Sequence, residues 1–146
     1  MGVTHYWERD IELPPDTFRM AVADCKKILC VLDIPLADAE GDDKPIFSDD
    51  EIIFNGMGGN GCEPFIFRRI QQPRKERNVV FSYCKTEHLP YDYAVKCCLI
   101  VLKYHFGREI KICSDDAEQG WEEAKNCVLK KSGYGISNLL SSSNKD

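Results

Sequence analysis

The sequence predicts a single α+β domain in which helices cover chiefly one face of a mixed, mostly antiparallel sheet of about five strands. Three observations lead to this fold class. Short alternating segments typical of strands are interspersed with segments of helical periodicity. Three strand-like segments between residues 51 and 84 follow one another without a helix, and residues 91–106 are apolar on almost every side. We therefore expect the order β-α-β-β-β-α-β-α over residues 1–135, followed by a flexible polar tail at 136–146.

The first third of the chain predicts one strand, one helix and a loop. Residues 3–13 are rich in the β-formers Thr, Tyr, Trp and Ile and end at two prolines, which is typical of a strand. Apolar residues then recur every three or four positions from Phe18 to Leu32, as on an amphipathic helix that ends before Pro35. Residues 33–50 are acidic and contain Pro and Gly, so we expect a long surface loop.

The middle of the chain predicts an antiparallel meander. Residues 51–55 and 64–70 have the composition of short strands, joined by the glycine-rich segment Gly56–Gly61. Residues 71–78 contain a proline and a basic run, which favour a solvated turn leading into a strand at 79–84.

The last third predicts a helix, a strand and a second helix. Pro90 is suited to the start of a helix that continues to Phe106 and ends at Gly107. Residues 109–113 alternate as a strand. Ser114 or Asp115 is expected to cap the final helix, because Glu118 lies three residues after Asp115.

Composition excludes several classes of partner. The chain has 19 basic and 24 acidic residues, a net charge of -5, which disfavours nucleic acid and anionic membranes. No apolar run approaches the roughly 20 residues that cross a bilayer. The eight cysteines accompany neither a secretory signal nor an Asn-x-Ser/Thr sequon, so we expect free thiols and a cytoplasmic location.

The segment Gly56–Gly61 matches the dinucleotide-binding pattern G-x-G-x-x-G after a strand. That pattern needs a helix immediately afterwards to hold the pyrophosphate, whereas residues 62–67 have the pattern of a strand. Asn-Gly pairs also favour turns. A hairpin turn is therefore favoured, and a nucleotide cradle with contacts from Asn55 and Gly58 is the alternative.

Metal ligands are sparse. Cys84 and His88 are the one close Cys/His pair, and no C-x-x-C occurs, whereas structural zinc sites usually have two close pairs. The acidic residues at 42–51 lack the spacing of a calcium-binding loop. We expect no metal and no cofactor.

A crevice is predicted where two strands end. If the strands at 79–84 and 109–113 pair through the intervening helix, the crossover makes them parallel, and their carboxyl ends lie side by side. Such edges are common ligand sites. This edge would collect polar residues from two turns: Cys84, Lys85, Thr86 and His88 from one, and Ser114, Asp115 and Asp116 from the other.

The crevice suggests possible chemistry. Cys84, beside Lys85 and near a helix N-terminus, is a candidate nucleophile, with His88 or Asp115 as the base. Candidate ligand contacts are Lys85, Thr86, Ser114 and Asp116. The alternative is that the hydroxyl and carboxyl groups cap helices and form turns, and that Lys85 is a solvated charge. His5 and Trp7 share one face of the first strand, where packing is their usual role.

The runs Phe81–Thr86, Pro90–Asp92 and Ser114-Asp115 resemble a pattern found in a set of small, mostly bacterial α+β proteins. The resemblance is clearest over about the central third of the chain. It implies no activity, cofactor or partner.

The sequence favours a protein-binding or regulatory module over an enzyme, because it contains no recognisable catalytic set. The expected partner is another protein or a second copy, the latter through the aromatic first strand. The alternative function is a small enzyme or ligand-binding protein that uses the crevice at Cys84–His88 and Ser114–Asp116.

Overall fold

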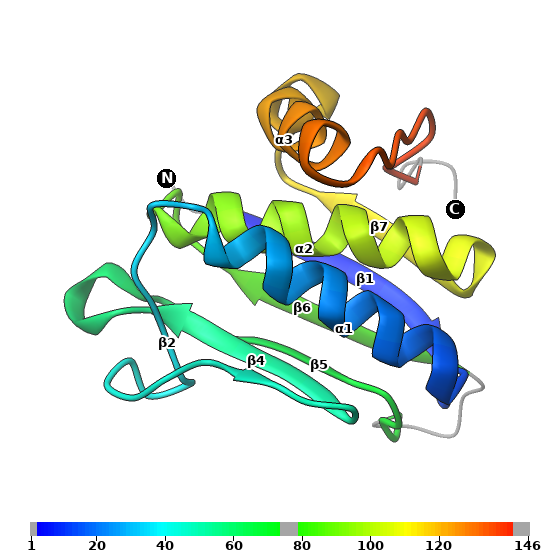
Figure 1. The fold of residues 1–146 in the computed structure, drawn as a ribbon, viewed down its shortest axis with the longest axis horizontal. Coiled ribbons are helices and arrows are strands. Elements are labelled where there is room, and N and C mark those ends of the chain that lie inside the picture. Colours follow the sequence, from blue (N-terminus) through cyan, green and yellow to red (C-terminus); the bar gives the residue numbers. More distant parts are fainter. Residues whose placement is uncertain (1–2, 74–78, 142–146) are drawn as a thin grey trace.

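The computed structural model describes residues 3–73 and 79–141. These residues form three α-helices and two antiparallel sheets, of three and four strands, which confirms the predicted α+β fold (Figure 1). Most of the basic turn predicted at 71–78 lies outside the described residues. In the part of the chain that is described, no helix has both the length and the hydropathy needed to span a membrane.

The first sheet is built around the N-terminal strand. β1 (Thr4–Asp10) pairs antiparallel with both β6 (Val79–Lys85) and β7 (Ile110–Ser114). β6 and β7 therefore run parallel but do not pair, which corrects the predicted direct pairing. A helical crossover fixes their common direction and leaves room for a strand between them. β1 fills that place because alternate side chains along it are buried on the helix-covered face.

The second sheet surrounds β4 (Glu51–Gly56). It pairs antiparallel with β5 (Phe65–Arg68) and with two short strands, β2 (Leu36–Ala37) and β3 (Ile46–Phe47). β2 and β3 lie within the segment predicted as a loop. The prediction missed them because two residues are too short to establish an alternating pattern.

The predicted meander is wrong at its last step, since β5 pairs with β4 while β6 pairs with β1. The reason lies in the segment after β5. The buried Arg9 guanidinium donates to the carbonyl oxygens of Arg68 and Arg69, and Gln71 N–H donates to Ile11 O at 2.9 Å. These bonds hold the segment against the end of β1, so it does not continue as a ladder along β6.

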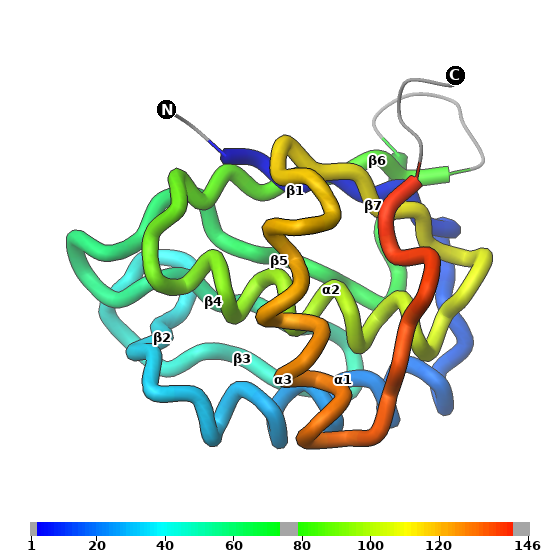
Figure 2. The backbone as a smooth tube through the Cα atoms, turned by 90° about the horizontal axis from the view of Figure 1, so that it is seen from above, coloured from blue at the N-terminus to red at the C-terminus, as the bar shows by residue number. Residues whose placement is uncertain are grey.

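α2 (Tyr91–Phe106) lies against one face of the first sheet and contacts β7. α1 (Pro15–Cys30) lies on the other side of α2 and contacts β3 of the second sheet, and α3 (Glu122–Ser132) packs on α2 (Figures 1 and 2). α2 is almost wholly buried, as predicted for the central helix. No helix of the described residues lies on the opposite face of the first sheet (Figure 2).

The final helix begins later than predicted. A 3₁₀ turn at Glu118–Trp121 precedes α3, which starts at Glu122. Ser114 and Asp115 do not cap it because their side chains are engaged elsewhere, Ser114 with His5 and Asp115 with the N–H of Thr4. Beyond α3, the chain returns to β7, where Ser141 N–H donates to Ile112 O at 2.7 Å.

Candidate functional site

The two turns of the predicted crevice do converge, through β1. His5 stands opposite Cys84 of β6 and opposite Ser114 of β7 in the sheet register. The residues that follow β6 and β7 therefore gather around the start of β1. We call this group the sheet-end cluster, and its members are His5, Thr86, His88, Asp92, Lys96, Ser114 and Asp116.

The centre of the sheet-end cluster is the buried imidazole of His5. Its Nδ1 lies 2.8 Å from Ser114 Oγ, and its Nε2 lies 2.6 Å from Asp92 Oδ1. The Trp121 ring packs edge-on against it, with ring centroids 5.1 Å apart. His5 therefore links the end of β7 to the first turn of α2, in a position that solvent does not reach.

Asp92 is the ionised partner in this arrangement. Burial alone would raise the pKa of Asp92, but hydrogen bonds from His5 and Thr86 and the positive charge of Lys96 outweigh it and lower the pKa to about 2. A carboxylate only accepts hydrogen bonds, so His5 carries a proton on Nε2. In the neutral ring Nδ1 is then an acceptor, and the Ser114 hydroxyl donates to it.

Lys96 joins α2 to the turn after β7. Its Nζ lies 2.7 Å from Asp116 Oδ2 and 3.3 Å from Asp92 Oδ2, and it donates to Gly120 O at 2.8 Å. His88, Asp92 and Asp116 together offer ligand atoms within 4.8 Å of one another, a spacing that could hold a metal ion. Because the Lys96 ammonium already bridges both carboxylates, a metal ion would have to compete with it.

The turn that carries Thr86 and His88 is strained. Glu87 and His88 have φ values of 57° and 61°, and Leu89 N–H donates to Thr86 O at 3.1 Å. Two consecutive left-handed residues define a type I′ turn, for which Asn-Gly is the usual sequence. The turn directs the Thr86 hydroxyl onto Asp92, whereas His88 is exposed.

Cys84 lies in surroundings that oppose a thiolate. Its side chain is buried, and its Sγ donates to Glu63 O at 3.4 Å. Burial and the nearby negative charge of Glu63 raise the pKa of Cys84 well above its ordinary value. Lys85 does not offset this effect, because its ammonium pairs with Glu87 at 3.1 Å on the surface.

Asp115 acts in local structure. Its Oδ2 accepts a hydrogen bond from Thr4 N–H, and its own N–H donates to Thr4 O, both at 3.0 Å. These bonds close the end of the β1–β7 ladder. The Asp115 side chain is exposed, whereas the His5 ring is buried, so the carboxylate that orients the ring is Asp92.

The glycine segment folds onto itself. The Asn55 amide oxygen accepts hydrogen bonds from Gly56 N–H and Cys62 N–H, and the amide nitrogen donates to Cys62 O. Gly58 is exposed, with a φ of 56°. β5 follows the segment, so no α-helix N-terminus stands ready for a phosphate, and the arrangement is that of a β4–β5 hairpin turn.

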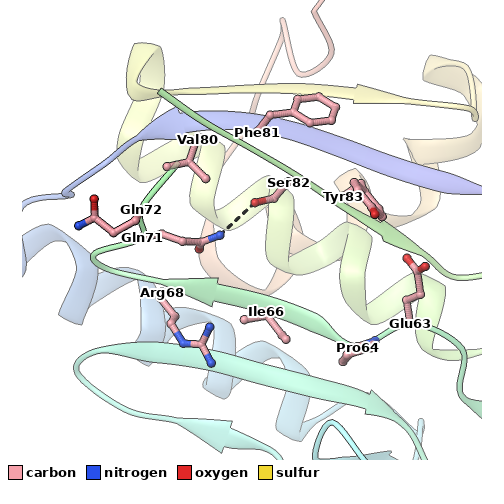
Figure 3. A pocket seen from close by; sticks show the side chains of 10 residues that line it. All are labelled: Glu63, Pro64, Ile66, Arg68, Gln71, Gln72, Val80, Phe81, Ser82 and Tyr83. Atoms are coloured by element: carbon pink, nitrogen blue, oxygen red, sulfur yellow. Dashed lines mark hydrogen bonds between the residues drawn. The ribbon is translucent and has the colours of Figure 1, made fainter. Parts of the chain in front are cut away.

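A second feature is a groove between the facing edges of β5 and β6, with a cavity volume of about 340 Å³ (Figure 3). Glu63 N–H donates to Lys85 O at 3.0 Å at one end, and Gln71 Nε2 donates to Ser82 Oγ at 3.1 Å at the other. We call it the β5–β6 groove. Its lining residues are Glu63, Pro64, Ile66, Arg68, Gln71, Gln72, Val80, Phe81, Ser82 and Tyr83.

Backbone groups of β6 are available in this groove. Both the N–H and the C=O of Lys85 are directed to Glu63. Directions alternate along an antiparallel strand, so Tyr83 and Phe81 turn their backbone groups to the same side. Within residues 3–73 and 79–141, no backbone hydrogen bond joins β5 to the Phe81–Tyr83 stretch.

His5, Asp92 and Lys96 were not predicted as site residues from the sequence. The spacing of Asp92 and Lys96, four residues apart on a helix, was a detectable signal for an ion pair. The role of His5 depends on the central place of β1, which no local pattern specifies.

Comparison of the chain with protein-family models, curated proteins and solved structures finds no match.

Proposed function

We propose that this chain is a protein-interaction module that binds an extended peptide segment in the β5–β6 groove. The observation that carries the proposal is the pair of facing strand edges. Among the described residues, no strand pairs with the backbone donors and acceptors on this side of β6. An extended peptide supplies the complementary row of N–H and C=O groups.

The side chains of the groove suit such a segment. Phe81 and Tyr83 are 53% and 46% exposed, and Ile66 lies across from them on β5 (Figure 3). Aromatic and aliphatic groups of this kind form the centre of most protein interfaces. The amide oxygen of Gln71, which is buried at the end of the groove, has no hydrogen-bond partner among the described residues. An N–H donor would satisfy it.

The helix-free face of the first sheet extends the docking surface. The rings of Tyr6 and Phe81 stack there, with centroids 6.1 Å apart. Phe81 belongs both to this face and to the groove. A peptide paired with β6 would therefore place alternate side chains against Tyr6, Phe81 and Tyr83. This alternation gives backbone-driven affinity and side-chain-driven selectivity.

The test is selection of random linear peptides displayed on phage against the immobilised chain, followed by fluorescence anisotropy with the selected synthetic peptide. We expect Ile66→Arg to weaken binding at least about tenfold, because it replaces the apolar side chain opposite Phe81 and Tyr83 with a charge. Met20→Arg is the matched control, since Met20 is 58% exposed on α1, away from the groove.

N-methylation of the peptide distinguishes strand pairing from side-chain contact alone. In a paired strand, alternate N–H groups point toward the partner, so methylation should abolish binding at every second position and be tolerated between them. Equal binding to wild type and Ile66→Arg, or equal tolerance of methylation at all positions, would exclude the proposed mode. Concentration-dependent mass of the chain without peptide would instead indicate that β6 pairs with a second copy.

A further inference from the structure

We propose that Ser114, His5 and Asp92 form a relay that makes the Ser114 hydroxyl an acceptor of acyl groups from neutral esters. Ser114 would be the nucleophile, His5 the general base and Asp92 the carboxylate that orients the base. The proposal is independent of the β5–β6 groove, because none of the three residues lines it.

The geometry is that of a nucleophile, base and acid in series. The Ser114 Oγ to His5 Nδ1 distance is 2.8 Å, and the His5 Nε2 to Asp92 Oδ1 distance is 2.6 Å. Such a constellation is recognised by its distances and roles, and not by the order of its residues in the chain. Here the residues come from β7, β1 and α2. The fixed proton on Nε2 leaves Nδ1 free to take the hydroxyl proton.

Accessibility matches these roles. Ser114 is partly exposed at the end of β7, while His5 and Asp92 are buried beneath it. Water is therefore kept from the base and the carboxylate, but a reagent can approach the hydroxyl. The Asp116 N–H donates to Ser114 Oγ at 2.9 Å. This bond holds the hydroxyl oxygen in place beside the imidazole.

Charge selects the substrate class. Asp92, Asp115 and Asp116 surround Ser114, and within this group one cation, Lys96, offsets them. The excess negative charge repels phosphates and carboxylates that approach the hydroxyl. A neutral ester avoids this repulsion. The described contacts identify no oxyanion hole beside Ser114, so we expect acyl transfer from activated esters, and not cleavage of ordinary peptide bonds.

The reaction balances with an ester and water. Ser114 Oγ forms a bond to the carbonyl carbon while its proton passes to His5 Nδ1, and the bond from that carbon to the leaving alkoxide breaks. His5 then protonates the alkoxide, which departs as the alcohol. In the second half a water molecule attacks the acyl-serine, His5 again takes and returns one proton, and the carboxylic acid leaves.

The first experiment is labelling of the intact chain with a biotin-linked alkyl fluorophosphonate, followed by peptide mass mapping. In this reaction the Oγ–P bond forms and the P–F bond breaks, and fluoride leaves with the serine proton. We expect one label at Ser114, none in Ser114→Ala, and unchanged labelling in Ser132→Ala. Ser132 is the matched control because its hydroxyl is also partly buried, bonds to Val128 O and Tyr134 N–H, and contacts no histidine in the described contacts.

Asp92→Asn tests the relay itself. We expect labelling at Ser114 to slow at least about tenfold, since the amide no longer stabilises a protonated imidazole. Circular dichroism of each variant establishes that it is folded. The wild-type chain decides the matter even if Asp92→Asn unfolds: no label, or label spread over several side chains, overturns the proposal. Labelling of folded Asp92→Asn at the wild-type rate overturns the part assigned to Asp92.

Discussion

Asp92 is expected to give the fold a defined sensitivity to acid. Its pKa is lowered from 3.8 to about 2, because hydrogen bonds from His5 and Thr86 and the charge of Lys96 outweigh the burial that would raise it. A carboxylate with a lowered folded-state pKa stabilises the fold above its unfolded pKa, and this contribution is lost as the pH falls toward the folded value. The window is therefore about pH 4 to pH 2.

The magnitude follows from the size of the shift. One pKa unit corresponds to about 1.4 kcal/mol, so the full contribution of Asp92 is roughly 2 to 3 kcal/mol. At pH 3 the same two pKa values give a loss of about 1 kcal/mol relative to neutral pH. The residue is buried, so solvent screening reduces this figure little.

Urea unfolding of wild type and Asp92→Asn between pH 6 and pH 3 measures the effect. The asparagine does not titrate, so the free-energy difference between the two proteins should be at least about 2 kcal/mol at pH 6 and shrink by about 1 kcal/mol at pH 3. Asp49→Asn, a substitution at an exposed loop position, is the control. A difference that stays constant over this range would refute the assigned role of Asp92.

Substitutions at three further places test the local structure, one of them with a matched control. Gly56→Ala should lower the free energy of unfolding by at least about 3 kcal/mol, since its Cβ would lie 2.0 Å from Asn60 O. Gly59→Ala is the control: its Cβ meets no atom within 4 Å, so it should change the free energy of unfolding little. Urea unfolding of both variants measures the difference. His88→Gly should raise the melting temperature by relieving about 1 kcal/mol of strain at a φ of 61°; a lower melting temperature would mean that the imidazole contributes more than the turn costs. Arg9→Met should lower the free energy of unfolding by about 3 kcal/mol, because several buried carbonyl groups lose their donor. Hydrogen exchange of this variant should show the largest loss of protection in the segment after β5.

Elements with long regular patterns were predictable from the sequence. α1 and α2 have many turns of apolar periodicity, and β1, β6 and β7 have enough alternating residues to be identified. What could not be predicted is which strands pair. The insertion of β1 between β6 and β7, and the separation of β5 from β6, depend on contacts between residues far apart in the chain.

The candidate site was predictable in its location and less so in its members. Thr86, Ser114 and Asp116 were expected at one sheet edge, and they lie there. Cys84 was favoured as a nucleophile because local sequence shows its neighbours but not its burial, and burial is what raises its pKa. His5 was expected only to pack, because that is the usual role of a histidine on a strand. Its candidate role as a base depends on Ser114 and Asp92, which the fold places on either side of its ring.

β1 contributes residues to both proposed sites, His5 at one end and Arg9 at the other. Its buried face presents His5, Trp7 and Arg9 in succession, with the indole between two polar groups. His5 organises the sheet-end cluster, whereas Arg9 fixes the chain after β5 and so helps to hold the β5–β6 groove open. The two ends share no hydrogen bond in the described contacts. Loss of fluorophosphonate labelling should therefore leave peptide binding intact, and loss of peptide binding should leave labelling intact, so that either proposal can fail without the other.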